Sequence, residues 1–177
     1  MKISTPAIQA KHALQRTQTE DYVEWATSML EAGEDSENLR ILAGLSRFAS
    51  PFEAEEHFRK ARKELGISEP TKVQAIRDYA IHLAQQIIDE TIPFQQGVEI
   101  LSQLCYSNDY PKYLMGWYNL DDGLTDIRCG QYPHTYPDLY GKSPKEIVIR
   151  AAHTFIKSNT EPGAAPHAGS GGPCQHQ

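Results

Sequence analysis

Apolar side chains recur at every third or fourth position along most of the chain, the spacing that places them on one face of an α-helix. Glycine or proline stands at the ends of the regular stretches, where helices commonly stop or start. Nothing comparable suggests strands. The pattern therefore predicts helices in residues 19–33, 36–44, 50–66, 70–88, 93–104 and 143–157. Two of these apolar stripes include an arginine, Arg62 in 50–66 and Arg77 in 70–88.

Polar residues with capping character mark several of the helix starts. Ser50, Pro51 and Glu53 have the sequence of a capping box, in which a serine hydroxyl and a glutamate carboxylate accept hydrogen bonds from free backbone N–H groups. The same arrangement returns at residues 143–146. At an earlier start, Thr19 precedes two acidic residues and is expected to be the cap.

The rest of the chain is less regular. Residues 1–18 are weakly patterned and are expected to form an N-terminal arm, or a short helix around residues 10–16. Prolines and glycines interrupt 106–142, which predicts short helical pieces there. Residues 158–177 are mostly Gly, Pro, Ala and polar residues and are expected to be a disordered tail. The sequence therefore predicts an all-α fold, an irregular or orthogonal bundle of about six to seven helices spanning residues 19–157.

Composition narrows the class of protein. The chain has 177 residues and a net charge of −6, which argues against nucleic-acid binding because Lys and Arg at the phosphates supply most of that affinity. No apolar run reaches the ~20 residues of a membrane-spanning helix, and the first residues lack the apolar core of a secretory signal. We therefore expect a cytoplasmic protein that does not bind membranes. No zinc, nucleotide or other cofactor motif occurs, and no cofactor is expected.

Aromatic and acidic residues are concentrated in one segment. Seven of the nine tyrosines and Trp117 lie between residues 106 and 140, together with five aspartates. Tyr and Trp are enriched at interface hot spots, and an acidic rim complements a basic partner. The sequence therefore predicts a partner-binding surface with these candidate residues: Tyr113, Trp117, Tyr118, Asp121, Asp122, Asp126 and Tyr132. The alternative is structural, with tyrosine rings packing an irregular end of the bundle.

A catalytic role is a further alternative for the same segment. Asp121, Asp122, Asp126 and His134 could form the site of a metal-dependent hydrolase, and Asp122 and Asp126 are spaced to share one helix face. Such a site requires several ligands that converge in a pocket, and sequence spacing does not establish convergence. Aspartates near a helix start also act as caps. The sequence therefore assigns no catalytic residue and no metal ligand.

Three stretches of the sequence resemble known proteins: DYVEWATSMLEAGEDSENLRILAGL, FEAEEHFRKARKELGI and NLDDGLTDIRCGQYPHTYPDLY. They resemble small all-helical bacterial proteins without an assigned activity, over roughly residues 20–157. The shared features are caps, core spacings and aromatics, so the resemblance carries over no catalytic residue. It implies an immunity-like or accessory protein. The leading expectation is a non-enzymatic module of the bacterial cytoplasm that binds another protein, and a structural subunit of a larger complex is the third option. The oligomeric state is left open.

Overall fold

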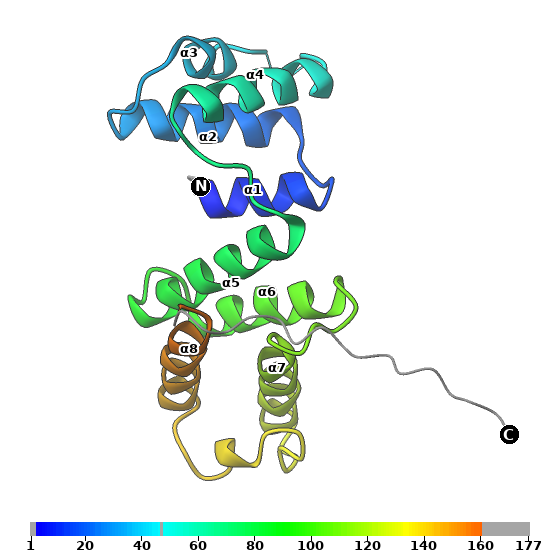
Figure 1. Cartoon of the computed structure of the whole chain (residues 1–177). Helices are drawn as coiled ribbons and strands as arrows, with labels where there is room; N and C mark the ends of the chain where they lie inside the picture. The colour runs from blue at the N-terminus through cyan, green and yellow to red at the C-terminus, as the bar shows by residue number, and fades with distance from the viewer. Residues whose placement is uncertain (1–2, 47, 161–177) are drawn as a thin grey trace, which may run out of the picture.

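The computed structural model describes residues 3–46 and 48–160. Over these residues the chain forms eight α-helices and one short 3-10 helix, with no strand (Figure 1). In chain order the elements are α1 (Thr5–Ala13), α2 (Thr19–Glu31), α3 (Glu37–Ala43), α4 (Pro51–Glu64), α5 (Lys72–Ile88), α6 (Phe94–Tyr106), α7 (Met115–Arg128), η1 (Pro137–Leu139) and α8 (Pro144–Thr160). The expected all-α bundle is confirmed. No helix within the described ranges is long and apolar enough to cross a membrane.

Helix α7 is continuous where the sequence predicted short pieces. Gly116 and Gly123 both lie inside it, although glycine lowers helix propensity. A Cβ atom on Gly123 would lie 3.0 Å from both Leu139 Cδ1 and Tyr136 Cβ. The absence of a side chain at Gly123 therefore lets the segment around η1 pack closely on α7. This contact explains why a glycine inside the helix is compatible with a stable fold.

The helix starts are positioned largely as expected, but their caps differ. Helices α4 and α8 begin at Pro51 and Pro144, yet the Ser50 side chain makes no capping hydrogen bond. Thr19 is the first residue of α2 rather than its cap, and its buried hydroxyl donates to the Ala49 carbonyl oxygen at 3.1 Å. Asp21 Oδ2 instead accepts from the Gln18 backbone N–H at 2.9 Å.

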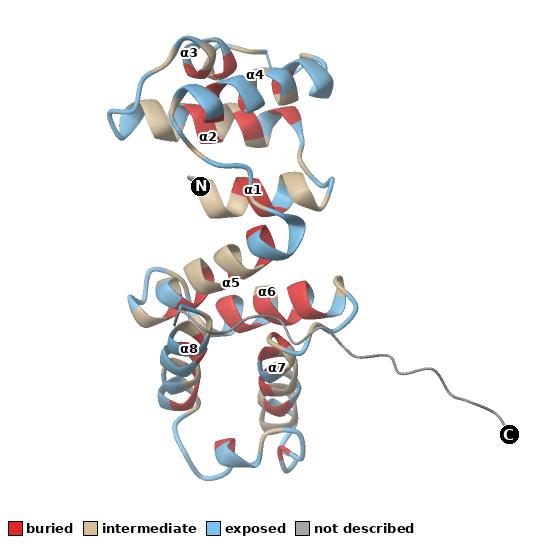
Figure 2. Ribbon diagram, viewed as in Figure 1, coloured by how far each residue is buried: buried red, intermediate tan, exposed pale blue. Residues whose placement is uncertain are grey.

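Buried apolar residues form two clusters, one in each half of the chain (Figure 2). The N-terminal cluster is built from α1–α4 around Trp25 and Phe58, whose ring centroids are 4.9 Å apart. The C-terminal cluster is built from α5–α8 and includes Leu101, Leu120 and Val148. Each half therefore has a hydrophobic core of its own.

Helix α1 packs against α2 and α5 and thereby joins the two halves. Its Ile8 is fully buried in the N-terminal cluster, whereas Leu14, just after the helix, packs against the C-terminal cluster. Gln9 Nε2 also donates to the Ser68 carbonyl oxygen at 3.2 Å. Residues 1–18, expected to be an arm or to hold a short helix around residues 10–16, thus contain a packed helix that begins at Thr5. At the other end of the chain, residues 158–160 of the expected tail belong to α8, and residues 161–177 lie outside the described residues.

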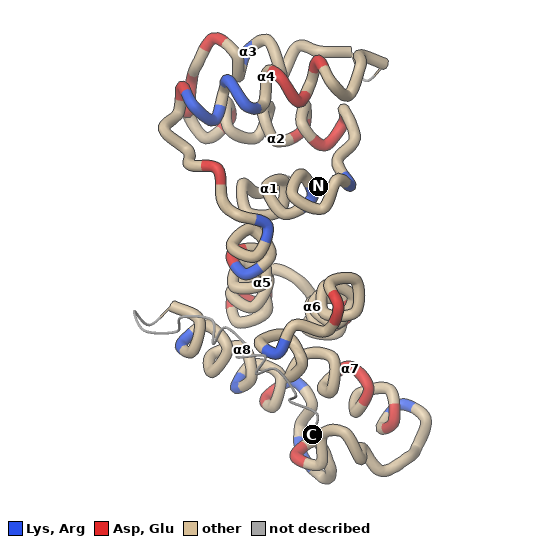
Figure 3. Tube along the Cα trace, turned by 45° about the vertical axis from the view of Figure 1, so that its right-hand side comes forward, with Lys and Arg blue, Asp and Glu red and all other residues tan. Residues whose placement is uncertain are grey.

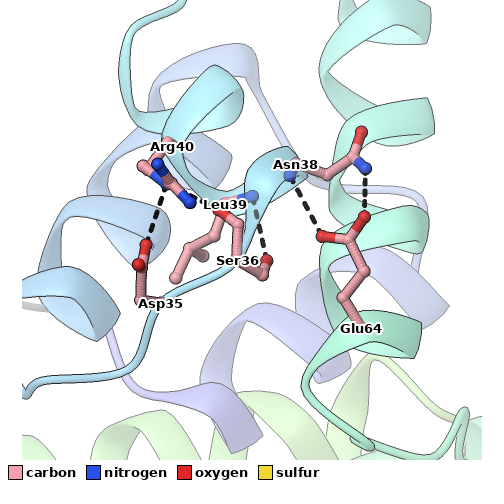
Figure 4. A network of polar contacts seen from close by, with 6 residues as sticks. All are labelled: Asp35, Ser36, Asn38, Leu39, Arg40 and Glu64. Carbon is pink, nitrogen blue, oxygen red and sulfur yellow. Dashed lines mark hydrogen bonds and ion pairs between the residues drawn. The ribbon is translucent and has the colours of Figure 1, made fainter.

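Polar contacts hold α3 against the end of α4 (Figure 4). Ser36 Oγ accepts from the Leu39 N–H at 3.3 Å and caps α3, and Asp35 pairs with Arg40 at 2.9 Å. The Glu64 carboxylate accepts from both the backbone and the side-chain amide of Asn38. Hydrogen bonds from Ser36 and Asn38 lower the pKa of Glu64 because they stabilise its charged form.

Two partly buried histidines make stability depend on pH. Burial lowers the pKa of His12, whose Nδ1 lies 2.8 Å from the Tyr22 hydroxyl, and burial also lowers the pKa of His82 on α5. Both histidines bind a proton more readily in the unfolded chain, where the ordinary pKa is about 6.5. The unfolded state therefore takes up more protons as the pH falls through about 6.5, and the free energy of unfolding is expected to decrease from about pH 7.5 to about pH 5.5.

This decrease is expected to be smaller in the variant His82→Gln, which removes one of the two histidines whose pKa burial lowers. Urea unfolding across the pH range measures it. The matched variant His153→Gln changes an exposed histidine on α8 and should retain the full decrease. A His82→Gln profile that coincides with the wild-type profile would contradict the prediction.

Candidate functional site

A groove of about 750 Å³ lies between α7 and α8 and is the strongest candidate for a binding site. Figure 1 shows these two helices extending from the layer of α5 and α6 towards the loop that carries η1. The groove is lined by residues of α5, α7, α8 and the loops that flank α7: Arg77, Lys112, Tyr113, Gly116, Trp117, Tyr136, Asp138, Arg150, Ala151, Thr154, Phe155, Ser158 and Asn159. Its volume falls within the range common for ligand sites in proteins.

Aromatic side chains form the apolar lining of the groove. Trp117 of α7 is 2% exposed and Phe155 of α8 is 8% exposed, and their rings meet edge to face with centroids 5.6 Å apart. Tyr113 and Tyr136 are half-buried beside them, and burial raises the pKa of both hydroxyls. Aromatic rather than aliphatic side chains of the C-terminal cluster therefore form the boundary between the core and the groove.

Positive charge predominates around this aromatic lining. The guanidinium carbon of Arg77 lies 5.1 Å from the centre of the Tyr113 ring, and Arg77 Nε has no hydrogen-bond partner among the described residues. Lys112 is exposed and forms no ion pair within the described part of the chain. The acidic group in the lining, Asp138, is already engaged by Arg150 at 3.3 Å and by Lys142 at 3.8 Å. Among the described residues, two cationic side chains of the lining therefore remain without an anionic partner.

The seven candidate residues from the sequence occupy different places. Tyr113 and Trp117 line the groove. Tyr118 instead packs edge to face on Tyr110, with ring centroids 5.2 Å apart. Tyr132 is exposed near the end of α7 and packs on Tyr140, with ring centroids 5.0 Å apart. Two of the four predicted aromatic residues therefore line the groove, and the other two pack on tyrosines outside its lining.

The three candidate aspartates lie on α7 outside the groove lining. Asp122 is exposed, and Asp121 and Asp126 are half-buried. In Figure 3, acidic positions mark α7 and mostly basic positions mark α8. The sequence suggested an acidic rim around the aromatic residues, and none of these three carboxylates belongs to the lining of the groove.

The residues of the hydrolase alternative are Asp121, Asp122, Asp126 and His134. In the part of the chain that the structure describes, no three or more His, Cys, Asp or Glu side chains are grouped so that they could hold a metal ion. His134 packs against the Tyr132 ring, with centroids 5.0 Å apart. The convergence that a metal-dependent hydrolase requires is thus not found among these residues.

Several lining residues were not candidates from the sequence. Phe155 and Arg150 come from α8, and Arg77 comes from α5, so they lie far from the tyrosine-rich segment in the chain. One signal was available: Arg77 stands in an otherwise apolar stripe, where a charged residue is unusual. Arginine at such a position indicates either a buried ion pair or the edge of a site. For Arg77, no acidic partner is found among the described residues.

Comparisons with protein-family models, with curated proteins and with solved structures each found no match for this chain.

Proposed function

We propose that this protein is a non-enzymatic protein-binding module, immunity-like or accessory in role, and that its α7–α8 groove receives an amphipathic helix of a partner protein. The observation that carries the proposal is an aromatic groove bordered by two cations that have no anionic partner among the described residues. The proposal agrees with the binding role expected from the sequence. It places the surface in the groove rather than along the aspartates of α7.

The shape and chemistry of the lining support a helical occupant. Grooves between helices commonly bind the apolar face of a partner helix, which places side chains at positions i, i+3, i+4 and i+7 into the groove. Trp, Tyr and Arg are the residue types enriched at binding hot spots, and Trp117, Tyr113 and Arg77 stand together here. Gly116 and Ala151 leave room between the rings for inserted side chains.

The charge of the groove favours an acidic partner rather than the basic partner expected from the sequence. Arg77 and Lys112 pair with no carboxylate of the described residues, and Asp138 is neutralised by Arg150 and Lys142. A glutamate or aspartate beside the apolar face of the incoming helix would pair with Arg77 or Lys112. Charge complementarity of this kind directs the approach of a partner and fixes its orientation. We therefore expect an acidic, amphipathic segment.

Selection from a random peptide library displayed on phage tests the proposal while the partner is still unidentified. The enriched peptides are expected to be acidic and to carry apolar residues at helical spacing. Their affinity should fall at least about tenfold for the variant Lys112→Glu, because the reversed charge repels an acidic peptide. The variant Lys63→Glu makes the same change at an exposed position on α4 and should bind with wild-type affinity.

Two results would contradict the proposal. One is enrichment of basic peptides. The other is enrichment of peptides whose affinity is the same for wild type and Lys112→Glu, because such peptides bind outside the groove.

A further inference from the structure

A second concave site lies in the N-terminal half, where α1, α2 and α4 meet the segment that leads into α5. This cleft has a volume of about 670 Å³, and its lining includes His12, Tyr22, Phe52, Glu55, Arg62 and Lys72. It shares none of its lining residues with the α7–α8 groove. The cleft is therefore an independent site, and no part of the proposed function rests on it.

Arg62 is the unusual residue of this cleft. Its side chain is 3% exposed, and its guanidinium carbon lies 4.8 Å from the centre of the Phe58 ring. Arg62 Nη2 pairs with Glu69 Oε2 at 3.1 Å, but Arg62 Nε has no hydrogen-bond partner among the described residues. Buried polar groups in proteins are nearly always hydrogen-bonded, because a buried donor without an acceptor destabilises the fold. An acceptor supplied by a ligand would satisfy this N–H group.

The surroundings of Arg62 favour an anionic acceptor. Lys72 is exposed, forms no ion pair within the described residues, and is the first residue of α5. The N-terminus of a helix carries partial positive charge that adds to the charge of the lysine. Glu69 already pairs with Arg62, so the other carboxylate of the lining, Glu55, is the one available to accept from a hydroxyl or ammonium group of the same ligand.

The mouth of the cleft has an apolar surface as well. The Phe52 side chain is 83% exposed at the start of α4 and lines the cleft. A bare inorganic ion would occupy a small part of the volume, whereas small-molecule sites commonly measure ~300–1,000 Å³. The cleft is therefore suited to a small molecule that has an apolar body attached to its anionic group.

We propose that this cleft binds a small organic oxyanion, held by Arg62 and Lys72 through its carboxylate or phosphate group and by Phe52 through its apolar body. Arginine and lysine form charge-assisted hydrogen bonds with both kinds of oxyanion, so the two share one recognition chemistry here. The Nε–H of Arg62 donates to one oxygen of the ligand, and the ammonium group of Lys72 donates to another.

Isothermal titration of the full chain with benzoate and with phenyl phosphate tests the proposal. At least one of the two is expected to bind saturably. The ligand that binds more tightly shows whether the cleft prefers a carboxylate or a phosphate group. The variant Lys72→Ala is expected to weaken binding about tenfold, and Phe52→Ala about fivefold. Both substitutions are at exposed positions and leave the buried Arg62 in place, so the fold is retained.

Two matched variants serve as controls. Lys157→Ala removes an exposed charge on α8, and Phe48→Ala removes a ring that is 86% exposed, and neither residue lines the cleft. Both are expected to bind the ligand with wild-type affinity. The proposal is overturned if neither benzoate nor phenyl phosphate binds saturably. It is also overturned if the control variants weaken binding as much as Lys72→Ala and Phe52→Ala do, because the ligand would then be bound by general surface charge and apolar area.

Discussion

Replacing Phe58 by alanine is expected to lower the free energy of unfolding of the N-terminal half by about 3–5 kcal/mol, the usual effect of deleting a buried aromatic ring. Phe58 is fully buried, and its ring lies 4.9 Å from the rings of both Tyr22 and Trp25 and 5.4 Å from that of His12. The guanidinium group of Arg62 also stacks on it. The substitution therefore removes the ring about which the N-terminal cluster is packed.

Urea unfolding of protein labelled with 5-fluorotryptophan measures this effect in each half separately. The chain has two tryptophans, Trp25 in the N-terminal cluster and Trp117 in the C-terminal cluster. Because each half has its own core, the transition reported by Trp25 should shift more than the one reported by Trp117. The variant Phe52→Ala deletes an exposed ring from the same helix and should change stability by less than about 0.5 kcal/mol. Equal losses of stability in the two variants would show that Phe58 does not have this role.

The variant Gly97→Leu is expected to destabilise the C-terminal half by about 1–3 kcal/mol through overpacking. Gly97 lies on α6 where that helix packs on α5, and a Cβ atom there would lie 2.5 Å from Ile87 Cγ1. Ile87 is itself buried, so its side chain has little space into which it can move. The larger side chain would force α5 and α6 apart and open the C-terminal cluster.

The matched substitution Gly116→Leu is expected to raise the free energy of unfolding, whereas Gly97→Leu lowers it. Gly116 also lies inside a helix, but a Cβ atom there would meet no atom within 4 Å. Leucine should therefore stabilise α7 by up to about 1 kcal/mol through its higher helix propensity. Chemical denaturation of both variants measures the difference. A Gly97→Leu protein as stable as Gly116→Leu would mean that α5 and α6 do not approach as closely as described.

Most of the helical architecture follows from local sequence. The stripes that contain Trp25, Phe58 and Leu101 have helical spacing and lie in α2, α4 and α6, and the prolines at 51 and 144 mark helix starts. Helix α1 was not distinguished from an arm because its burial depends on distant contacts. Ile8 is buried in a cluster whose other members lie on α2, α3 and α4, and this burial leaves little trace in the pattern of residues 1–18. The sequence predicts short pieces in place of the single helix α7, because glycine is unfavourable inside a helix. Gly123 is accommodated there through its close packing on Leu139 and Tyr136, which the local sequence does not reveal.

Only some residues of the candidate site can be predicted from the sequence. Tyr113 and Trp117 were found because aromatic enrichment is a local property, and both line the groove. Phe155 and Arg77 were not found because α8 and α5 reach the groove only through tertiary packing. The position of the aspartates relative to the aromatic rings cannot be predicted from the sequence either, because it depends on which face of α7 packs inward. An arginine within an otherwise apolar stripe is the local feature that indicates a site in this chain, because Arg62 and Arg77 each line a concave site.

The most direct test of the proposed groove is a fluorine NMR titration of the 5-fluorotryptophan-labelled chain with a peptide enriched in the library selection. Trp117 lines the groove, whereas Trp25 lies buried in the N-terminal cluster, so the two resonances report on different halves of the molecule. Binding in the groove predicts a saturable shift of the Trp117 resonance, an unmoved Trp25 resonance, and loss of the shift in Lys112→Glu. A peptide that binds while the Trp117 resonance stays in place would contradict the account.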